Sequence, residues 1–484
     1  LDRARLARTM VLVTSLRGSV AALRRLSADS LAGAEFLFDA ARQEIARVAT
    51  LGVAGFDAPV SGDAIVESAA ALEGVRDALA PWRALLADRD PARALDARFD
   101  AAIADLRTHP DFDSFDRFGF IVRFVQPLAH EVADMQRALR IEPPARRRAW
   151  STRAASIYDA DAVDARFYAP DDAPRGAAIA ALGAALFFDS RLSPSRTRSC
   201  ASCHAPRRAF TDGRALPSLL ETHPGAIVRN TPSLVGVATQ PDLFADERAH
   251  FLEDQITDVL GSASEMGGSL DQAASVLRAD TAYRRWFAAA FADGEDAAVT
   301  PRRVRFAIAS YLRGIPANHS RFDRAIAGDS GALSPVERQG FNLFMGRAGC
   351  GTCHFPPGFS GATPPTLVES EPEVLGVPVR WPARRLAVDS DPGRWGVRRT
   401  LTNRGAFKTP TLRNVAVTGP YMHNGAFRTI DEVIDFYDAG GGAGLGLSVP
   451  NQTLPADSLH LTRSEKRSLI AFMRALTDSA YAPR

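Results

Sequence analysis

All four cysteines of this 484-residue chain fall into two short motifs of the same form. The first is CASCH at residues 200–204, and the second is CGTCH at residues 350–354. A protein held together by disulfides would distribute its cysteines over other spacings, and a zinc site needs two Cys pairs close enough to converge on one ion. The arrangement therefore argues against both a disulfide framework and a zinc site.

The C-x-x-C-H pattern is typical of covalent attachment of c-type haem. Two thiols one helical turn apart can each form a thioether with a haem vinyl group, and the His that follows can ligate the iron from the proximal side. We therefore predict two covalently bound c-type haems. The residues that would hold them are the Cys and His residues of the two motifs, Cys200, Cys203, His204, Cys350, Cys353 and His354.

The alternative interpretation is a thioredoxin-like redox pair or a four-cysteine zinc site, each followed by a coincidental His. Two complete motifs favour haem over this alternative. Haem of this type is attached outside the cytosol, because the thiols must reach a dedicated ligation system in reduced form, so the motifs predict a periplasmic protein. Residue 1 is Leu rather than Met, so a targeting segment could already have been removed from this sequence.

Charge and hydropathy exclude several other classes of function. The 58 Lys and Arg residues and 56 Asp and Glu residues give a net charge of +2, which provides no sustained field for nucleic acid or an anionic membrane. No uncharged apolar run approaches the roughly 20 residues that span a bilayer. We expect a globular protein of two or three domains, with no nucleic-acid partner and no membrane span.

The surroundings of the two motifs are alike, which indicates an internal duplication. An apolar helical stretch with a Leu-Phe pair precedes each motif, and the downstream segment NTPSLVGVA at 230–238 matches KTPTLRNVAVT at 408–418. Few alternating runs typical of strands occur. We predict a mainly α fold with two cytochrome c-like haem domains, at 165–330 and 331–484.

Residues 1–148 are predicted to form an all-helical N-terminal bundle of unknown role, because heptad-like apolar spacing recurs in three stretches. The segment EPPARRRAW then reads as a linker. His109 and His130 have no second ligand at helical spacing, so we interpret them as ordinary surface or core histidines. The region 356–400, rich in Pro, Gly and Arg, is predicted to be a long loop excursion with a short hairpin.

An ordered set of short motifs in the region of about 165–480 resembles the bacterial di-haem cytochrome c peroxidase family, which includes the maturation enzyme MauG. The motifs are LFFDSRLS, CASCH, RNTPSL, LEDQ, SEMGG, CGTCH, KTPTLRN and GPYMHNG. The resemblance implies that His204 is the proximal ligand at the peroxidatic haem and His354 the proximal ligand at the electron-transfer haem. It also implies that Glu265 is the distal acid that moves a proton during O–O cleavage, with Gln255 as the accompanying amide. Without the family order, Glu265 would be interpreted as a solvated loop acid.

The resemblance further implies a calcium ion between the two haem domains. Its ligands would be the side chain of Asn230 and the backbone carbonyls of Thr418 and Pro420, oxygen donors of the kind that Ca²⁺ prefers. An Asn before Thr-Pro is equally compatible with a simple turn.

The sequence departs from the family pattern at three positions. Ala245, in LFADERA, stands where many relatives carry a Trp that relays electrons between the haems. Val259 stands where relatives often carry Pro in the distal pocket. His223 lies near the loop that supplies a displaceable distal His in reductively activated relatives, but we expect an open peroxidatic iron instead. The tryptophans that could replace the relay are Trp286, Trp381 and Trp395.

The segment after residue 419 contains three side chains able to bind a metal, Met422, His423 and Tyr437. A capping box predicts a helix from residue 429, and apolar spacing puts Tyr437 on its buried face, where it could simply be a core tyrosine. The resemblance implies that this position carries the distal ligand of the electron-transfer haem, which is Met in ordinary peroxidases and Tyr in MauG. We therefore predict Tyr437 as a ligand of the haem iron. Phenolate favours ferric and higher states, so this ligand would favour states up to one with both irons as Fe(IV).

Three functions remain as hypotheses. The first is a periplasmic peroxidase that reduces H2O2 to water through high-valent haem, with electrons from a small donor protein such as a cytochrome c or cupredoxin. The second is MauG-like oxidation of residues on a partner protein. The third is a di-haem electron carrier or redox sensor, which the presence of Glu265 and Gln255 disfavours because a carrier needs no distal acid. The absence of the Trp at Ala245 weakens the second. A monomer and a homodimer are both compatible with the sequence.

Overall fold

The computed structural model of the protein describes residues 10–11, 13–15, 17–19, 21–22, 33–86, 89–215, 229–292 and 299–482. Helices dominate the described chain, which confirms the prediction of a mainly α fold. His223 and most of the first apolar stretch near the N-terminus lie outside the described residues. None of the described helices is long and apolar enough to cross a membrane.

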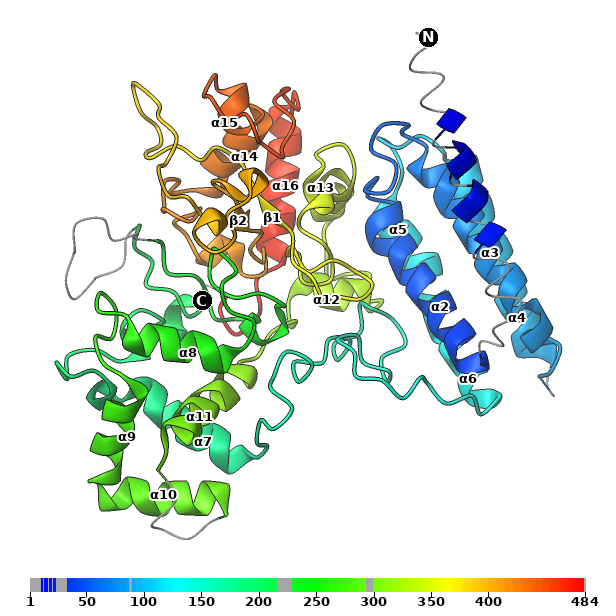
Figure 1. Ribbon diagram of the computed structural model, residues 1–484. Coiled ribbons are helices and arrows are strands. Elements are labelled where there is room, and N and C mark those ends of the chain that lie inside the picture. The colour runs from blue at the N-terminus through cyan, green and yellow to red at the C-terminus, as the bar shows by residue number, and fades with distance from the viewer. Residues whose placement is uncertain are drawn as a thin grey trace.

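The elements follow one another in three groups (Figure 1). The N-terminal group comprises α2 (Ala34–Arg47), η1 (Val48–Gly52), α3 (Ala64–Arg83), α4 (Arg89–Thr108), α5 (Arg117–Phe120), η2 (Ile121–Val125) and α6 (Gln126–Ala138). The first half comprises α7 (Ala177–Phe188), η3 (Ser190–Leu192), η4 (Cys200–Ser202), η5 (Pro206–Arg208), η6 (Val237–Thr239), α8 (Leu252–Gly261), α9 (Leu270–Arg278), α10 (Thr281–Phe291) and α11 (Pro301–Arg313).

The second half continues to the C-terminus with short strands among its helices. It comprises α12 (Arg321–Ile326), α13 (Pro335–Met345), η8 (Cys350–Thr352), β1 (Pro372–Glu373), η9 (Arg394–Gly396), η10 (Leu401–Asn403), β2 (Phe407–Lys408), η11 (Val415–Val417), α14 (Ile430–Asp438), α15 (Gly441–Gly444) and α16 (Arg463–Ala475). β1 pairs antiparallel with β2, with Pro372 opposite Lys408. Figure 1 shows the N-terminal helices to one side, with the first half below the second.

A pair of crossing helices lies at the centre of each half. α7 packs on α11 in the first half, and α13 packs on α16 in the second. A Cβ at Gly183 would lie 1.8 Å from the carbonyl oxygen of Ala307, and a Cβ at Gly340 would lie 2.0 Å from that of Ser468. Because only glycine tolerates such an approach of two backbones, the same device sets both helix crossings.

Side-chain caps fix where the principal helices of the second half begin. At the start of α13, the Ser334 hydroxyl accepts a hydrogen bond from the backbone N–H of Glu337, and the Glu337 carboxylate accepts one from the backbone N–H of Ser334. Thr429 and Glu432 form the same capping box before α14, and α16 begins in the same way. These reciprocal bonds satisfy N–H groups that the first helical turn leaves free.

The described N-terminal helices share one hydrophobic core with the second half. Phe118 meets Phe341 of α13 edge-on, with 5.8 Å between ring centroids. Phe56 meets Phe355, the residue after the second Cys-His motif, with 5.3 Å between centroids. The N-terminal helices are therefore packed directly beside one of the two predicted haem sites, a relationship that the sequence pattern did not reveal.

Arg117 lies at the centre of this contact and is fully buried. Its guanidinium donates to the carbonyl oxygens of Val53, Phe112 and Phe115 at 2.7, 2.6 and 3.1 Å. Burial lowers the pKa of Arg117 to about 10. The three carbonyl acceptors replace the water that the guanidinium loses on burial. In this way one side chain fixes the loop before α5.

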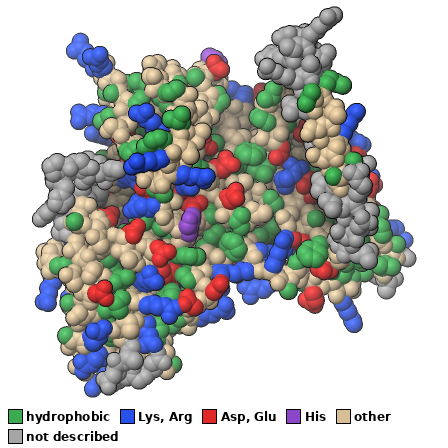
Figure 2. All heavy atoms as spheres, viewed as in Figure 1, with side chains coloured by type: hydrophobic (Ala, Val, Ile, Leu, Met, Phe, Trp, Pro, Cys, Tyr) green, Lys and Arg blue, Asp and Glu red, His purple; other side chains and the backbone are tan. Residues whose placement is uncertain are grey.

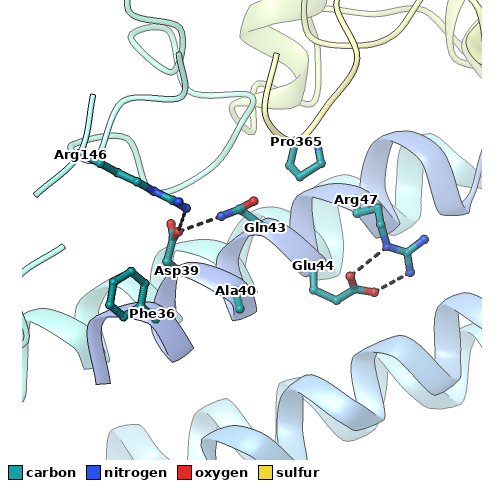
Figure 3. Close-up of a pocket in the computed structure, with 8 residues that line it drawn as sticks. All are labelled: Phe36, Asp39, Ala40, Gln43, Glu44, Arg47, Arg146 and Pro365. Carbon is teal, nitrogen blue, oxygen red and sulfur yellow. Dashed lines mark hydrogen bonds and ion pairs between the residues drawn. The ribbon is translucent and has the colours of Figure 1, made fainter. Parts of the chain in front are cut away.

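A surface hollow of about 330 Å³ lies where α2, the linker and the second half meet (Figure 3). Asp39 of α2 accepts a hydrogen bond from Gln43 at 2.8 Å and pairs with Arg146 of the linker at 3.2 Å. Pro365 borders the hollow from the second half. None of the residues that line it belongs to the predicted haem or calcium sites.

Candidate haem and calcium sites

The first Cys-His motif forms a tight turn that presents its His ring to the interior. η4 spans Cys200–Ser202, and the His204 N–H donates to the Cys200 carbonyl at 2.9 Å. His204 Nδ1 lies 3.0 Å from the carbonyl oxygen of Phe210, and the Pro232 carbonyl also acts on the ring. Burial lowers the pKa of His204, so the ring is neutral, with Nδ1–H donating and the Nε2 lone pair free to bind a metal.

The second motif has the same construction. The His354 N–H donates to the Cys350 carbonyl at 2.9 Å, and His354 is buried. Its Nδ1 lies 3.3 Å from the Phe359 carbonyl and 3.0 Å from the Pro410 carbonyl. Burial lowers the pKa of His354 to about 4, so this ring is also neutral with a free Nε2.

Both His rings are thus oriented by the carbonyl of a nearby Phe and by the carbonyl of a Pro far along the chain. The two prolines, Pro232 and Pro410, each follow Thr in the repeated segments noted from sequence. A backbone acceptor on the second ring nitrogen fixes the tautomer of a metal-binding His and raises the basicity of the other nitrogen. Sequence reasoning did not assign a role to these prolines, although the repeated Thr-Pro pair was the available signal.

The four thiols fit covalent attachment of a haem. All four cysteines are free, and burial raises the pKa of Cys200 and of Cys350 to about 12. Burial and the neighbouring Glu373 raise the pKa of Cys353, whose S–H donates to Oε1 of Glu373 at 3.2 Å. Neutral thiols that face an apolar interior beside a His with a free Nε2 are the donor set that a c-type haem requires. No sequence signal identified Glu373.

Glu265 lies close to the first motif. It is half-buried in the turn after α8, and its charge acts on Cys203. Burial raises the pKa of Glu265, while a hydrogen bond from Ser262 and the charge of Arg248 act against the rise. A carboxyl group with a raised pKa can hold a proton and release it near neutral pH.

Gln255 and Val259 lie on α8, immediately before the turn that carries Glu265. Gln255 is half-buried, and Val259 packs against the core of the first half. Glu253 on the same helix is already engaged, because both its oxygens accept from Arg313 at 2.8 Å. Unlike Glu253, Glu265 makes no ion pair with any residue that the structure describes.

Tyr437 faces the second motif from α14. Burial raises its pKa strongly, and the charges of Cys353, Cys350 and Glu373 add to the rise, which shows that the hydroxyl lies near the second attachment turn. Tyr437 and Met422 both pack against a small apolar cluster around Phe427 and Phe436. Tyr437 and Met422 therefore lie in the same neighbourhood, and the ligand role of Tyr437 stays a prediction.

His423 is turned away from this cluster. Its ring stacks on Phe407 with 3.6 Å between centroids and 9° between planes. Its Nε2 lies 3.5 Å from Oδ2 of Asp389, and this proximity lowers the pKa of Asp389. The stacking and the carboxylate leave His423 without a free approach to a metal at the second motif.

The structure brings together two of the three residues expected to bind calcium. The Asn230 side-chain amide lies 2.6 Å from the Pro420 carbonyl oxygen, and the Asn230 N–H donates to the His423 carbonyl at 2.6 Å. Thr418 lies two residues before Pro420, with its hydroxyl bonded to the Val415 carbonyl at 3.4 Å. Among the described residues no group of three or more His, Cys, Asp or Glu could hold a metal.

The position of the missing Trp lies at the contact between the two halves. The carbonyl of Ala245 accepts from the Lys408 N–H at 2.9 Å, beside the Phe407 ring. Arg229 of the first half lies over the same ring, 5.6 Å from its centroid. Trp286 instead stacks on Tyr283 at the surface of α10, and Trp381 packs on Phe427; Trp395 lies in η9.

The fold and the two sites define an α-helical protein with two c-type haem attachment sites. A family model described as di-haem cytochrome c peroxidase matches residues 177–331. The chain is 32% identical to the methylamine utilization protein MauG of Methylorubrum extorquens, over 68% of this chain and 88% of the relative. It is 34% identical to the cytochrome-c peroxidase IdrP1 of Denitromonas iodatirespirans, over 64% and 84% respectively.

Solved structures of a MauG-like protein and of a di-haem peroxidase also resemble this protein. A MauG-like protein associated with microbial copper homeostasis has a TM-score of 0.53 and 31% identity, and covers 65% of this chain and 93% of its own. The di-haem peroxidase BthA of Burkholderia thailandensis has a TM-score of 0.51 and 26% identity, over 66% and 90%. The chain belongs to the di-haem cytochrome c peroxidase family, as predicted from its motifs, and is an oxidoreductase. The family implies two c-type haems.

Proposed function

We propose that this protein is a periplasmic di-haem peroxidase that reduces H2O2 to water with electrons from a small donor protein. The observation that carries the proposal is Glu265, a half-buried carboxyl with a raised pKa beside the first attachment motif. A protein that only carries electrons needs no such acid. When bound, the haems supply the iron that meets peroxide and the redox equivalents that the reaction consumes.

Glu265 would serve the proton transfer. Reduction of one H2O2 takes two electrons and two protons and gives two waters, so a proton must reach the departing oxygen as the O–O bond breaks. Burial raises the pKa of Glu265 and so favours the protonated form that can donate in this step. Gln255 of α8 would orient peroxide by hydrogen bonding from its amide.

The two proximal histidines would be held for iron by the backbone. The Phe210 and Pro232 carbonyls fix His204, and the Phe359 and Pro410 carbonyls fix His354. This shared arrangement, with the shared glycine crossings, supports an internal duplication with haem domains at 165–330 and 331–484. Tyr437 would help to hold the iron of the second haem, and Asn230, Thr418 and Pro420 would hold Ca²⁺ between the halves.

A second candidate function is oxidation of residues on a partner protein, which the similarity to MauG and the position of Tyr437 support. Steady-state consumption of H2O2 by the holoprotein with a reduced small cytochrome separates the two. Sustained turnover supports the peroxidase, and the partner-oxidation function predicts inertness toward the donor despite reaction with H2O2. The N-terminal residues 1–148 would be a helical module packed against the second half.

A further inference from the structure

The excursion at residues 377–404 of the second half concentrates positive charge on one surface. It contains seven arginines and two aspartates in a chain whose net charge is only +2. Six of the arginines are exposed: Arg380, Arg384, Arg385, Arg398, Arg399 and Arg404. In Figure 2, Lys and Arg side chains gather at the upper left, where Figure 1 draws the loops of the second half.

The fold separates the charges of this segment. Asp391 is turned inward, where it accepts from Arg229 at 2.7 and 3.0 Å. Asp389 accepts from Asn424 at 2.6 Å, and Arg394 pairs with the buried Glu247. Both aspartates and Arg394 are thus engaged in contacts within the protein. None of the six exposed arginines makes an ion pair with any residue that the structure describes.

Hydrogen bonds hold the surface formed by residues 377–404, called the platform below, in a fixed shape. The Val379 N–H donates to the Ala387 carbonyl at 3.0 Å, which closes a short hairpin. The Asn451 amide donates to the carbonyls of Leu401, Thr402 and Arg404 at 2.9 to 3.4 Å and holds the last turn. Pre-organised charges lose less conformational entropy when a partner binds.

Apolar side chains lie between the arginines. Val379, Val397 and Leu401 are 59%, 48% and 77% exposed. Exposed aliphatic groups surrounded by arginines are typical of protein interfaces, because the apolar groups are desolvated at the centre and Arg is enriched there. Nucleic-acid sites rely on phosphate contacts from basic side chains, to which exposed aliphatic groups contribute little.

The platform is joined to the second predicted haem site. Trp381, within the segment, packs on Phe427 in the cluster against which Tyr437 packs. Directly after the segment the chain enters β2 and then reaches Pro410, whose carbonyl holds His354. A partner bound here would lie beside the half that we propose exchanges electrons with a donor.

We propose that residues 377–404 are the docking surface for a small acidic electron-donor protein. This inference rests on the proposed peroxidase function for the role of the partner. Complementary charge mainly raises the association rate and selects the partner, and it weakens as salt screens it. The partner that fits this surface is an acidic redox protein, and the experiment distinguishes it from a polyanion.

The test uses the holoprotein and one small c-type cytochrome in two forms, unmodified with its basic surface and succinylated on its lysines so that it becomes acidic. Binding is measured by calorimetry at low and at high salt. The variant R384E/R385E reverses two platform charges. The variant R153E/R175E makes the same charge change at two exposed arginines outside the platform.

We expect the acidic form to bind the wild type and the control variant equally, and the unmodified form to bind neither. The platform variant should bind the acidic form about tenfold more weakly at low salt, with a smaller salt dependence. Equal affinity of both variants overturns the proposal. Tighter binding of single-stranded DNA or anionic vesicles than of the acidic cytochrome also overturns it.

A separate assay tests the proposed peroxidase function without protein docking. H2O2 consumption with hydroquinone, a neutral small reductant, reports peroxidase activity without protein docking and should be equal in both variants and the wild type. Absence of that activity refutes the peroxidase function, whereas its presence with unchanged docking refutes only the platform.

Discussion

Phe407 and His423 stack with 3.6 Å between ring centroids and 9° between planes, at the contact between the two halves of the molecule. The stack engages His423, Arg229 covers the Phe407 ring, and the His423 carbonyl accepts from Asn230. The three side chains able to bind a metal after residue 419 are thereby separated: His423 belongs to the contact between halves, and Tyr437 faces the second attachment motif.

Replacement of Tyr437 by Phe should change the optical spectrum of the second haem. The hydroxyl is the only iron donor that this side chain offers, so its loss leaves the sixth position to water or to another residue. Tyr437→Met should raise the reduction potential, since a thioether favours ferrous iron. Optical and potentiometric titrations measure both effects. His423→Leu is the control and should leave the spectrum unaltered; a spectrum of Y437F identical to the wild type would show that Tyr437 is not a ligand.

Glu265→Gln should slow the reaction with H2O2 by roughly 10²- to 10⁴-fold, the usual contribution of a positioned acid–base group. Because burial raises the pKa of Glu265, the protonated fraction that can donate falls as the pH rises through that pKa. The wild-type rate should therefore fall toward alkaline pH, and E265Q should lack this limb. Stopped-flow mixing with H2O2 over a pH series measures the rate for both proteins. D254N, an exposed change on α8, is the control, and equal rates in E265Q and the wild type would remove Glu265 from the mechanism.

Asn230→Ala should abolish Ca²⁺ binding and lower the thermal unfolding midpoint. A ligand that binds only the folded state stabilises it by about 2.7 kcal/mol at 100 times its dissociation constant, and chelation removes that contribution. Elemental analysis and calorimetry of the holoprotein before and after chelation measure the effect. A wild-type protein without bound calcium, or one whose midpoint ignores the chelator, contradicts the proposed site.

Glu247 should make stability depend on pH. Burial raises the pKa of Glu247 to about 7, with Arg394 acting in the opposite direction. The folded state therefore keeps a proton that the unfolded chain loses near its ordinary pKa of about 4.3, so this contribution to stability is lost as the pH rises from there through about 7. The loss amounts to at most about 4 kcal/mol, at about 1.4 kcal/mol per pKa unit. Denaturant unfolding at several pH values should show a flatter profile for E247Q, and identical profiles would contradict the account.

The sequence predicted what local patterns can specify. A capping box predicted the start of α14, and the two Cys-His motifs indicated the family. The mainly α prediction followed from apolar periodicity of 3.6, which depends only on near neighbours.

What remained hidden depends on contacts between distant segments. Pro410 reaches His354 from 56 residues along the chain, and Asn342 contacts Phe118 and Asp116 from more than 200. No periodicity encodes such pairings, so neither the role of Pro410 nor the shared core of the N-terminal helices and the second half was predictable. The outward arginines of 377–404 were visible as composition, but only the fold shows that their acidic neighbours point inward.

The electron stoichiometry of the holoprotein decides whether it is a peroxidase. Pulses of H2O2 are added to the enzyme with an excess of a reduced small cytochrome, and the oxidised cytochrome is counted optically. The account predicts two electrons withdrawn for each H2O2 consumed, sustained over many turnovers, and strongly slowed in E265Q. Peroxide consumption without oxidation of the donor, or no consumption by a protein that carries both haems, would contradict it.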